Sequence, residues 1–261
     1  MKFKKLFGIT FIIISIFLLG ITVYGIFNPN DYRKLFSKKT LSYRQTLQCI
    51  DNAFKKYGKT VFFLKEAVEC YNKGIVYIWP SKYTKISFKD NYILNILSYF
   101  DNLFYKIKLT KNPHLFSEFQ SCKYERALGR GFGICSQNAL GLADLLYKKY
   151  KIETHIIELH GHVVLEAVIK EKKYILDPSV GLFIPYNLNY IEKHLNYIFN
   201  LYKNTNHPEL AKTYQPPNEI SPIIGSYEQT PRLSKLECWS DVLKWIIPIF
   251  LFILGLILYK N

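Results

Sequence analysis

The sequence has few acidic residues, few cysteines, no internal repeat and no low-complexity run. Its 261 residues include 20 Asp and Glu against 35 Lys and Arg, so the formal net charge is +15, and only five are Cys. A chain that is 49% apolar is neither a disordered tail nor a disulfide-stapled mini-protein. Its length suits one sizeable domain or two small ones.

The basic excess favours an acidic partner, which means nucleic acid, anionic lipid or an anionic polymer. The sequence contains no nucleic-acid-binding motif, so we expect no nucleic acid partner. An anionic envelope polymer and lipid headgroups remain the candidate partners. A solvated, lysine-rich surface, with clusters such as Lys148, Lys149 and Lys151, accounts for the same composition and stays open as the alternative.

The first apolar stretch runs from Phe7 to Phe27 without a charged residue. A helix of this length, at about 1.5 Å rise per residue, crosses a hydrocarbon core of roughly 30 Å. A cleaved signal peptide would have a shorter apolar core and a small-residue cleavage site, whereas residues 25–29 read GIFNP. We predict a short cytoplasmic stub and an uncleaved transmembrane helix over residues 1–27.

The second apolar stretch, Trp245 to Tyr259, is short for a membrane span. Extending it back to Val242 includes Lys244, whose long side chain can reach the membrane interface. A buried C-terminal core helix is the alternative, but that helix would be apolar on every face at the end of the chain. We predict a second transmembrane helix over residues 242–261.

Two spans place both termini on one side of the cell membrane and the central domain on the other. Lysines at the two ends favour cytoplasmic termini, and basic residues just after the first span favour the reverse. Long loops cross membranes largely regardless of their charge, so the end lysines have more weight and we predict an extracytoplasmic central domain. The two groups are Lys2, Lys4, Lys5 and Lys260, and Arg33, Lys34, Lys38 and Lys39.

The central region divides by its pattern. Residues 28–120 show apolar residues at helical spacing, residues 121–200 carry the chemistry-bearing motifs, and residues 201–241 contain several prolines without periodicity. We expect the last segment to be an extended connector or a strap over the domain. The apolar and aromatic stripe of residues 90–107 is expected to face the core. The expected helices are Thr40–Tyr57, Thr60–Asn72 and Asp90–Ile107.

Cys135 follows a glycine-rich approach and opens a helical pattern. The sequence GRGFGICSQ covers residues 129–137, and apolar residues then recur at helical spacing from Ala139 to Leu146. The partial positive charge at a helix N-terminus favours the thiolate over the thiol, and the thiolate is the nucleophilic form. The flanking glycines allow a sharp turn and close substrate approach. Cys135 is therefore the candidate nucleophile.

His162 and Asp177 lie on two predicted strands, His162–Ile169 and Tyr174–Asp177, joined by a charged turn. An even-numbered hairpin loop would project both side chains from the same face, with Asp177 opposite Val164 and diagonal to His162. Asp177 would then hold one imidazole nitrogen, and the other would face Cys135. This is the arrangement of nucleophile, base and orienting carboxylate.

Three blocks resemble a known family: GRGFGICSQ at residues 129–137, GHVVLE at 161–166 and LDPSVGLFIPY at 176–186. They resemble the transglutaminase-like superfamily, in particular its bacterial membrane-anchored members. The resemblance covers less than a quarter of the chain. It implies an α+β, papain-like core, in which the cysteine-bearing helix packs on an antiparallel sheet, and a Cys135–His162–Asp177 triad. Many members have an aromatic residue two positions after the histidine, where this chain has Val164.

The expected activity is that of a membrane-anchored cysteine hydrolase or acyltransferase. It would act on amide or peptide bonds of an unidentified protein or peptide through an acyl-enzyme, with hydrolysis favoured over transfer to an amine. Because the family includes members without catalysis, the alternative is a silent binding module in an envelope or glycan-assembly complex. No cofactor is expected, and no metal, because His155, His160 and His162 lack further ligands for a tetrahedral set.

Two questions remain open at this level. The oxyanion requires a donor besides the backbone N–H of Cys135, and Gln120, Tyr124 and Gln137 are candidates. Four cysteines remain besides Cys135, and they allow three pairings. Cys49 and Cys70, on neighbouring predicted helices, are one candidate pair, and four free buried thiols are the favoured alternative. The remaining two cysteines are Cys122 and Cys238.

Overall fold

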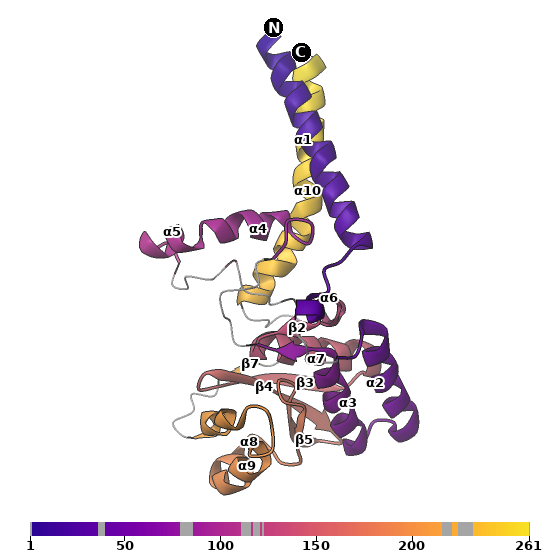
Figure 1. Ribbon diagram of the computed structural model, residues 1–261, viewed down its shortest axis with the longest axis vertical. Helices are drawn as coiled ribbons and strands as arrows, with labels where there is room; N and C mark the ends of the chain where they lie inside the picture. Colours follow the sequence, from indigo (N-terminus) through magenta and orange to yellow (C-terminus); the bar gives the residue numbers. More distant parts are fainter. Residues whose placement is uncertain are drawn as a thin grey trace. The chain divides into compact units, whose positions relative to one another are not determined.

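The computed structural model describes residues 2–35, 40–78, 86–110, 116, 121, 123–215, 221–223 and 232–260. The fold is α+β, as the sequence predicts (Figure 1). The chain forms two compact units, one of residues 1–30, 82–119 and 235–261 and the other of residues 31–81 and 120–234. Residues 82–119 therefore fold with the two terminal helices and not with the rest of the central region.

The larger unit is built on an antiparallel sheet with the strand order β6-β5-β4-β3-β7. Its strands are β3 (Glu153–Leu159), β4 (His162–Ile169), β5 (Lys172–Asp177), β6 (Leu182–Ile184) and β7 (Ser221–Ile223). A second, two-stranded parallel sheet pairs β1 (Val76–Tyr77) with β2 (Phe132–Gly133). β7 comes from the segment predicted to be an extended connector or a strap over the domain, and it forms the edge of the sheet beside β3.

Helices cover both faces of this sheet because successive strand residues point to opposite sides (Figure 1). Leu165 and Leu176 pack against one group of helices, whereas Val164 and Ile175 pack against the other. The first group is α2 (Tyr43–Tyr57), α3 (Val61–Gly74), α6 (Tyr124–Arg130) and α7 (Cys135–Tyr150). The second is α8 (Leu188–Lys193), α9 (Leu195–Tyr202) and the 3-10 helix η2 (Pro208–Tyr214), while the short η1 (Tyr32–Leu35) precedes α2.

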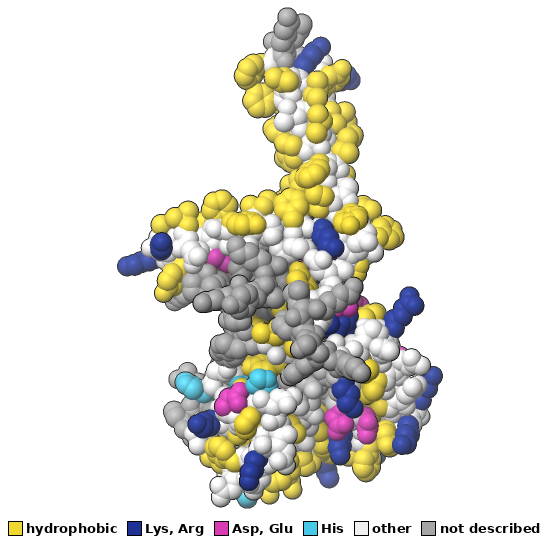
Figure 2. Space-filling view, viewed as in Figure 1, with side chains coloured by type: hydrophobic (Ala, Val, Ile, Leu, Met, Phe, Trp, Pro, Cys, Tyr) yellow, Lys and Arg dark blue, Asp and Glu magenta, His cyan; other side chains and the backbone are white. Residues whose placement is uncertain are grey.

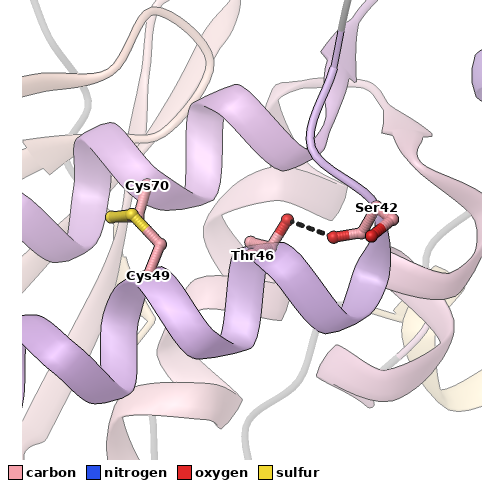
Figure 3. The surroundings of a disulfide bond; sticks show 4 residues. All are labelled: Ser42, Thr46, Cys49 and Cys70. Carbon is pink, nitrogen blue, oxygen red and sulfur yellow. Dashed lines mark hydrogen bonds between the residues drawn. A yellow bond between two sulfur atoms is a disulfide. The ribbon is translucent and has the colours of Figure 1, made fainter.

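A disulfide joins α2 to α3 through Cys49 and Cys70 (Figure 3). The two helices also approach closely at Gly74. A Cβ at that position would collide with the Thr46 side chain. Thr46 in turn donates a hydrogen bond to the carbonyl of Ser42 at 2.9 Å. Cys238 is also disulfide-bonded. The favoured alternative of four free thiols is therefore wrong, the candidate pair is confirmed, and Cys122 lies outside the described residues.

The smaller unit pairs two long helices, α1 (Lys2–Phe27) and α10 (Arg232–Lys260), which run side by side with their outer ends together (Figure 1). They touch at Gly8 and Gly255, where a Cβ on Gly8 would lie 2.7 Å from the Gly255 carbonyl oxygen. Ser15 Oγ also donates to the Pro248 carbonyl at 2.7 Å. Small residues and interhelical hydrogen bonds of this kind are typical of helix pairs in membranes.

Both long helices are apolar enough to cross a membrane, over Phe3–Phe27 and Leu236–Lys260. The apolar window of each is only 17% buried, which is unlike the core helix that was the alternative for the C-terminal stretch. The C-terminal helix begins at Arg232, earlier than the predicted residue 242. The uncharged stretch from Trp245 thus continues a longer helix that extends to Lys260.

Pro248 interrupts the hydrogen bonding of α10, and another residue compensates. Proline has no N–H, so Pro248 donates no helical hydrogen bond to the Lys244 carbonyl. The hydroxyl of Tyr92 donates to this carbonyl at 3.2 Å. Tyr92 begins α4 (Tyr92–Tyr99), which is followed by α5 (Asp101–Lys106).

The apolar stripe of residues 90–107 was predicted to face the core, and this prediction is wrong. It forms α4 and α5 in place of one helix, and its apolar residues Ile96, Phe100, Leu103 and Ile107 are exposed. Burial instead falls on Tyr92, Leu94, Ser98 and Asp101. The apolar pattern correctly predicts helices, but the buried face of α4 and α5 is the more polar one.

Candidate active site

Cys135 is the first residue of α7, directly after the short strand β2. Ile134 precedes it in an extended conformation. Its apolar side chain accepts no hydrogen bond from the first N–H groups of the helix. Gly131 ends α6 with a φ of +72°, a value that glycine adopts without strain. The glycine-rich approach therefore serves the turn that places Cys135 at the helix N-terminus.

His162 and Asp177 are joined by a hydrogen bond, Nε2 to Oδ2, of 2.8 Å. β4 and β5 connect through a two-residue turn, Lys170-Glu171, and Leu165 pairs with Leu176. In this register Asp177 falls opposite Val164, as the sequence predicts for an even-numbered loop. Both side chains are fully buried.

Cys135 lies within electrostatic reach of His162. Burial opposes a charge on the imidazole, but the charge and hydrogen bond of Asp177, together with Cys135, outweigh burial and raise the pKa of His162 to about 10. His162 Nδ1 is buried and forms no hydrogen bond, so it is the ring nitrogen left for the thiol. The hydrogen bond between a nucleophile and its base is often long or poorly aligned before a substrate binds.

The Asp177 carboxylate accepts two further hydrogen bonds. The Tyr202 hydroxyl donates to Oδ2 at 2.6 Å, and the Ser179 backbone N–H donates to Oδ1 at 2.9 Å. Burial would raise the pKa of Asp177, but His162 and these donors reverse the effect and lower it. Tyr202 also contacts the Tyr214 hydroxyl at 3.1 Å. Asp177 is thus held as an anion in a buried environment.

Tyr77 lies beside the same group. Strand pairing places it next to Gly133, two residues before Cys135. Its ring meets the His162 ring edge-on at 6.4 Å between centroids, and the His207 ring at 4.9 Å. Burial raises the pKa of Tyr77, and the charges of Cys135 and Asp177 raise it further. A half-buried phenol therefore borders the thiol and the imidazole.

Sequence reasoning missed Tyr77, Tyr202 and Tyr214. Each is one of 21 tyrosines, and none stands in a motif. Tyr214 belongs to the segment that was read as a connector, and Tyr77 is brought to the site by a strand of only two residues. A pattern of apolar spacing gives no signal for hydroxyl groups that meet only after folding.

The candidate oxyanion donors have other partners or lie elsewhere. The Gln137 amide donates to the Ser121 carbonyl at 3.1 Å and accepts from the Ser121 N–H, so it holds that backbone segment. Tyr124 begins α6, and its N–H donates to Asp144. Gln120 lies outside the described residues. The backbone N–H of Cys135, at the first position of α7, remains a candidate donor.

The remaining charged residues of the sequence analysis have local partners. His155 contacts Glu153 at 3.2 Å, and on the neighbouring strand Glu166 forms an ion pair with Lys173 at 2.9 Å. Lys148 and Lys149 pair with Asp144 and Asp51. Across the ranges that the structure describes, no three His, Cys, Asp or Glu residues gather as metal ligands.

Comparison of the chain with protein-family models, with curated proteins and with solved structures finds no match.

Proposed function

We propose that the chain is a membrane-anchored cysteine enzyme that cleaves amide or peptide bonds through an acyl-enzyme. The observation that carries the proposal is the fully buried His162–Asp177 pair, with its second imidazole nitrogen unpartnered and Cys135 in electrostatic reach at a helix N-terminus. A structural histidine does not need this arrangement, whereas a thiol nucleophile does.

In the proposed reaction the Cys135 thiolate attacks the carbonyl carbon of the substrate. The backbone N–H of Cys135 donates to the developing oxyanion. As the C–N bond breaks, the His162 imidazolium gives its proton to the leaving amine, and a thioester remains. His162 then takes a proton from water, the resulting hydroxide attacks the thioester, and the acid leaves as the sulfur returns to the thiolate.

Asp177 supports each of these steps by position and charge. Its carboxylate holds Nε2, so the imidazole keeps Nδ1 directed to the sulfur side, and its negative charge stabilises the imidazolium. The raised pKa of His162 keeps the ring protonated at neutral pH, so the imidazolium can give its proton to the leaving amine. Water is present in any aqueous compartment, and we propose hydrolysis as the favoured outcome over transfer to an amine.

The resemblance of the three sequence blocks to the transglutaminase-like superfamily supports the same proposal. In a papain-like core the cysteine-bearing helix packs on an antiparallel sheet. Here α7 packs against β3 and β4, and its Leu142 and Leu145 belong to the same core cluster as Ile156 and Leu165. The fold assignment at this finer level rests on that resemblance and on this packing.

We also propose two spans with an extracytoplasmic central domain. The Cys49–Cys70 disulfide and the disulfide-bonded Cys238 favour an oxidising compartment for the chain outside its spans. Arg33, one of the basic residues that favoured the opposite orientation, is buried and pairs with Asp31 at 2.8 Å, so its charge is compensated inside the fold. The contacts of α1 with α10 favour an N-terminal helix that is kept.

The silent binding module remains the second candidate because one observation favours it. Cys135 exposes only 7% of its surface, which limits the approach of a carbonyl group. In that case the thiol would be inert, and the three side chains would only stabilise the fold where β4 begins and β5 ends.

The test is detection of the thioester on Cys135. The full chain in nanodiscs is incubated with a membrane extract, and mass spectrometry follows the tryptic peptide that contains Cys135, with and without hydroxylamine, which cleaves thioesters. The proposal expects a hydroxylamine-sensitive adduct on the wild-type chain and none on Cys135→Ala. A wild-type chain that carries no such adduct supports the silent module instead.

A further inference from the structure

The helices α4 and α5 leave an apolar face exposed. Ile96, Phe100, Leu103 and Ile107 are all exposed, and at 100° per residue they fall within an arc of roughly 60°. The backbone stays near helical values across Phe100, and the Phe104 N–H donates to the Phe100 carbonyl at 2.9 Å. The arc therefore runs without interruption along both helices.

The opposite side of the same helices is the side that packs. Leu94, Ser98 and Asp101 are buried there, and Asp101 accepts a hydrogen bond from the Phe116 N–H at 3.0 Å. A surface helix of a water-soluble unit normally turns polar residues outward. Here the outward arc is apolar, which means that something other than water covers it.

The N-terminal end of α4 contacts both long helices, near the end of the apolar stretch of α1 and the start of that of α10. The Lys244 ammonium donates to the Asp90 carbonyl at 2.9 Å, one residue before Trp245. On the other helix, a Cβ on Gly25 would collide with the Lys89 carbonyl. Residues 89–92 therefore lie at the level where α1 ends its apolar stretch and α10 begins its own.

From that level α4 and α5 run across the direction of the α1–α10 pair (Figure 1). Figure 2 shows hydrophobic side chains along the edge of α4 and α5 on the side toward which the two long helices extend. Lys106 and Lys108 are exposed at the far end, where ammonium groups meet lipid phosphates favourably. The apolar arc is thus continuous with the surface of the two candidate spans.

We propose that α4 and α5 form an interfacial helix pair whose apolar arc is buried in the surface of the bilayer that α1 and α10 cross. An amphipathic helix in this position lies with its apolar face about 5–10 Å into the boundary between headgroups and acyl chains. The occupant of the arc is lipid, and the pair fixes the depth of the smaller unit in the membrane. This inference rests on membrane anchoring and is independent of the proposed catalysis.

Three exposed phenylalanines allow a matched test. Phe17 lies on α1, Phe100 on the arc and Phe62 on α3, and they expose 59%, 44% and 63% of their surface. Each is replaced in turn by p-acetylphenylalanine and labelled with a ketone-reactive nitroxide, which leaves every cysteine in place. The full chain is reconstituted in nanodiscs of phosphatidylcholine and phosphatidylglycerol, and power saturation measures collision with oxygen and with a water-soluble nickel chelate.

The label at position 100 is expected to collide more with oxygen than with the nickel chelate, as the label at position 17 does, and position 62 is expected to show the reverse. A label at position 100 that behaves like position 62, or that is shielded from both reagents by protein, overturns the interfacial assignment. A water-exposed label at position 17 overturns the membrane anchoring on which it rests.

Discussion

The hydroxyl of Tyr202 donates a 2.6 Å hydrogen bond to the Oδ2 atom of Asp177, the same oxygen that contacts His162. Tyr202 is fully buried at the end of α9, and its hydroxyl also meets that of Tyr214. Two tyrosines from the helices between β6 and β7 thus help to hold the carboxylate that orients the imidazole.

Replacing Tyr202 with Phe removes this donor and keeps the ring. Hydrogen bonds to charged groups contribute about 1.5–3 kcal/mol, so the free energy of unfolding is expected to fall by about that amount. The pKa of Asp177 is expected to rise, since one of the groups that lower it is lost. Urea unfolding and the acid limb of the Cys135 alkylation rate measure the two effects.

The matched control is Tyr197→Phe on the same helix, whose ring contacts Tyr186. It is expected to leave the acid limb unchanged. An equal shift of the acid limb in both variants would contradict a specific role for Tyr202.

The pH dependence of stability has a defined direction at His162. Its pKa rises from 6.5 to about 10 on folding, so its contribution is complete below pH 6.5 and disappears as the pH rises through 10. Asp177 has a lowered pKa, so its contribution is present above its ordinary value of 3.8 and is lost as the pH falls below that value.

The difference in unfolding free energy between the wild type and His162→Gln is therefore expected to be largest between pH 4 and 6.5 and to shrink toward pH 10. Urea unfolding of both chains across this range measures it. A difference that grows with pH would show that the ring is buried in its neutral form.

Substitution of Asp177 by Asn keeps the size of the side chain and removes its charge. In triads of this kind the loss of the carboxylate lowers the rate by roughly 10⁴-fold, because the imidazole is no longer held in the required form. We expect a loss of roughly 10³–10⁴-fold in thioester formation, measured by stopped-flow with an activated ester. Asp51→Asn, which affects an ion pair with Lys149, serves as the control and is expected to retain the rate.

Removal of the Cys49–Cys70 disulfide tests the constraint between α2 and α3. The bond closes a loop with a sequence separation of 21, for which the loop-entropy relation gives about 3 kcal/mol. The double variant Cys49→Ala/Cys70→Ala is expected to lose about this amount in urea unfolding. Reductant is unsuitable because it also acts on the disulfide of Cys238.

A double-mutant cycle tests the compensation at Pro248. Tyr92→Phe removes the hydroxyl that donates to the Lys244 carbonyl, at a cost of about 1–3 kcal/mol. In a Pro248→Ala background the helix supplies an N–H to that carbonyl, so Tyr92→Phe is expected to cost less. Equal costs in the two backgrounds, measured by denaturation in bicelles, would show that the contact is incidental.

Local patterns predicted the parts of the fold that depend on neighbouring residues. The strand His162–Ile169 was predicted with the bounds that the structure gives. The charged turn was predicted over Lys170–Lys173, but it is shorter, because β5 already begins at Lys172 and pairs with Ile169. The relation of His162 to Asp177 followed from the register of one hairpin.

The rest depends on partners distant in sequence or outside the chain. Apolar spacing identified the helices near Ile96 and Leu103 but assigned their exposed face to a protein core, because it cannot distinguish a core from a lipid surface. The strand β7 adopts its conformation only because β3 offers a free edge. Tyr77 and Tyr214 reach the site through segments without any periodic signal.

The most direct test of the central proposal is the rate at which an iodoacetamide probe alkylates Cys135, the one free cysteine among the described residues, at pH 7. We predict rapid alkylation of the wild-type chain, a rate lower by roughly 10²-fold or more in His162→Ala, and an unchanged rate in His160→Ala, which removes an exposed histidine two positions away. Slow alkylation of the wild type, at the rate seen in His162→Ala, would contradict an activated thiol at Cys135.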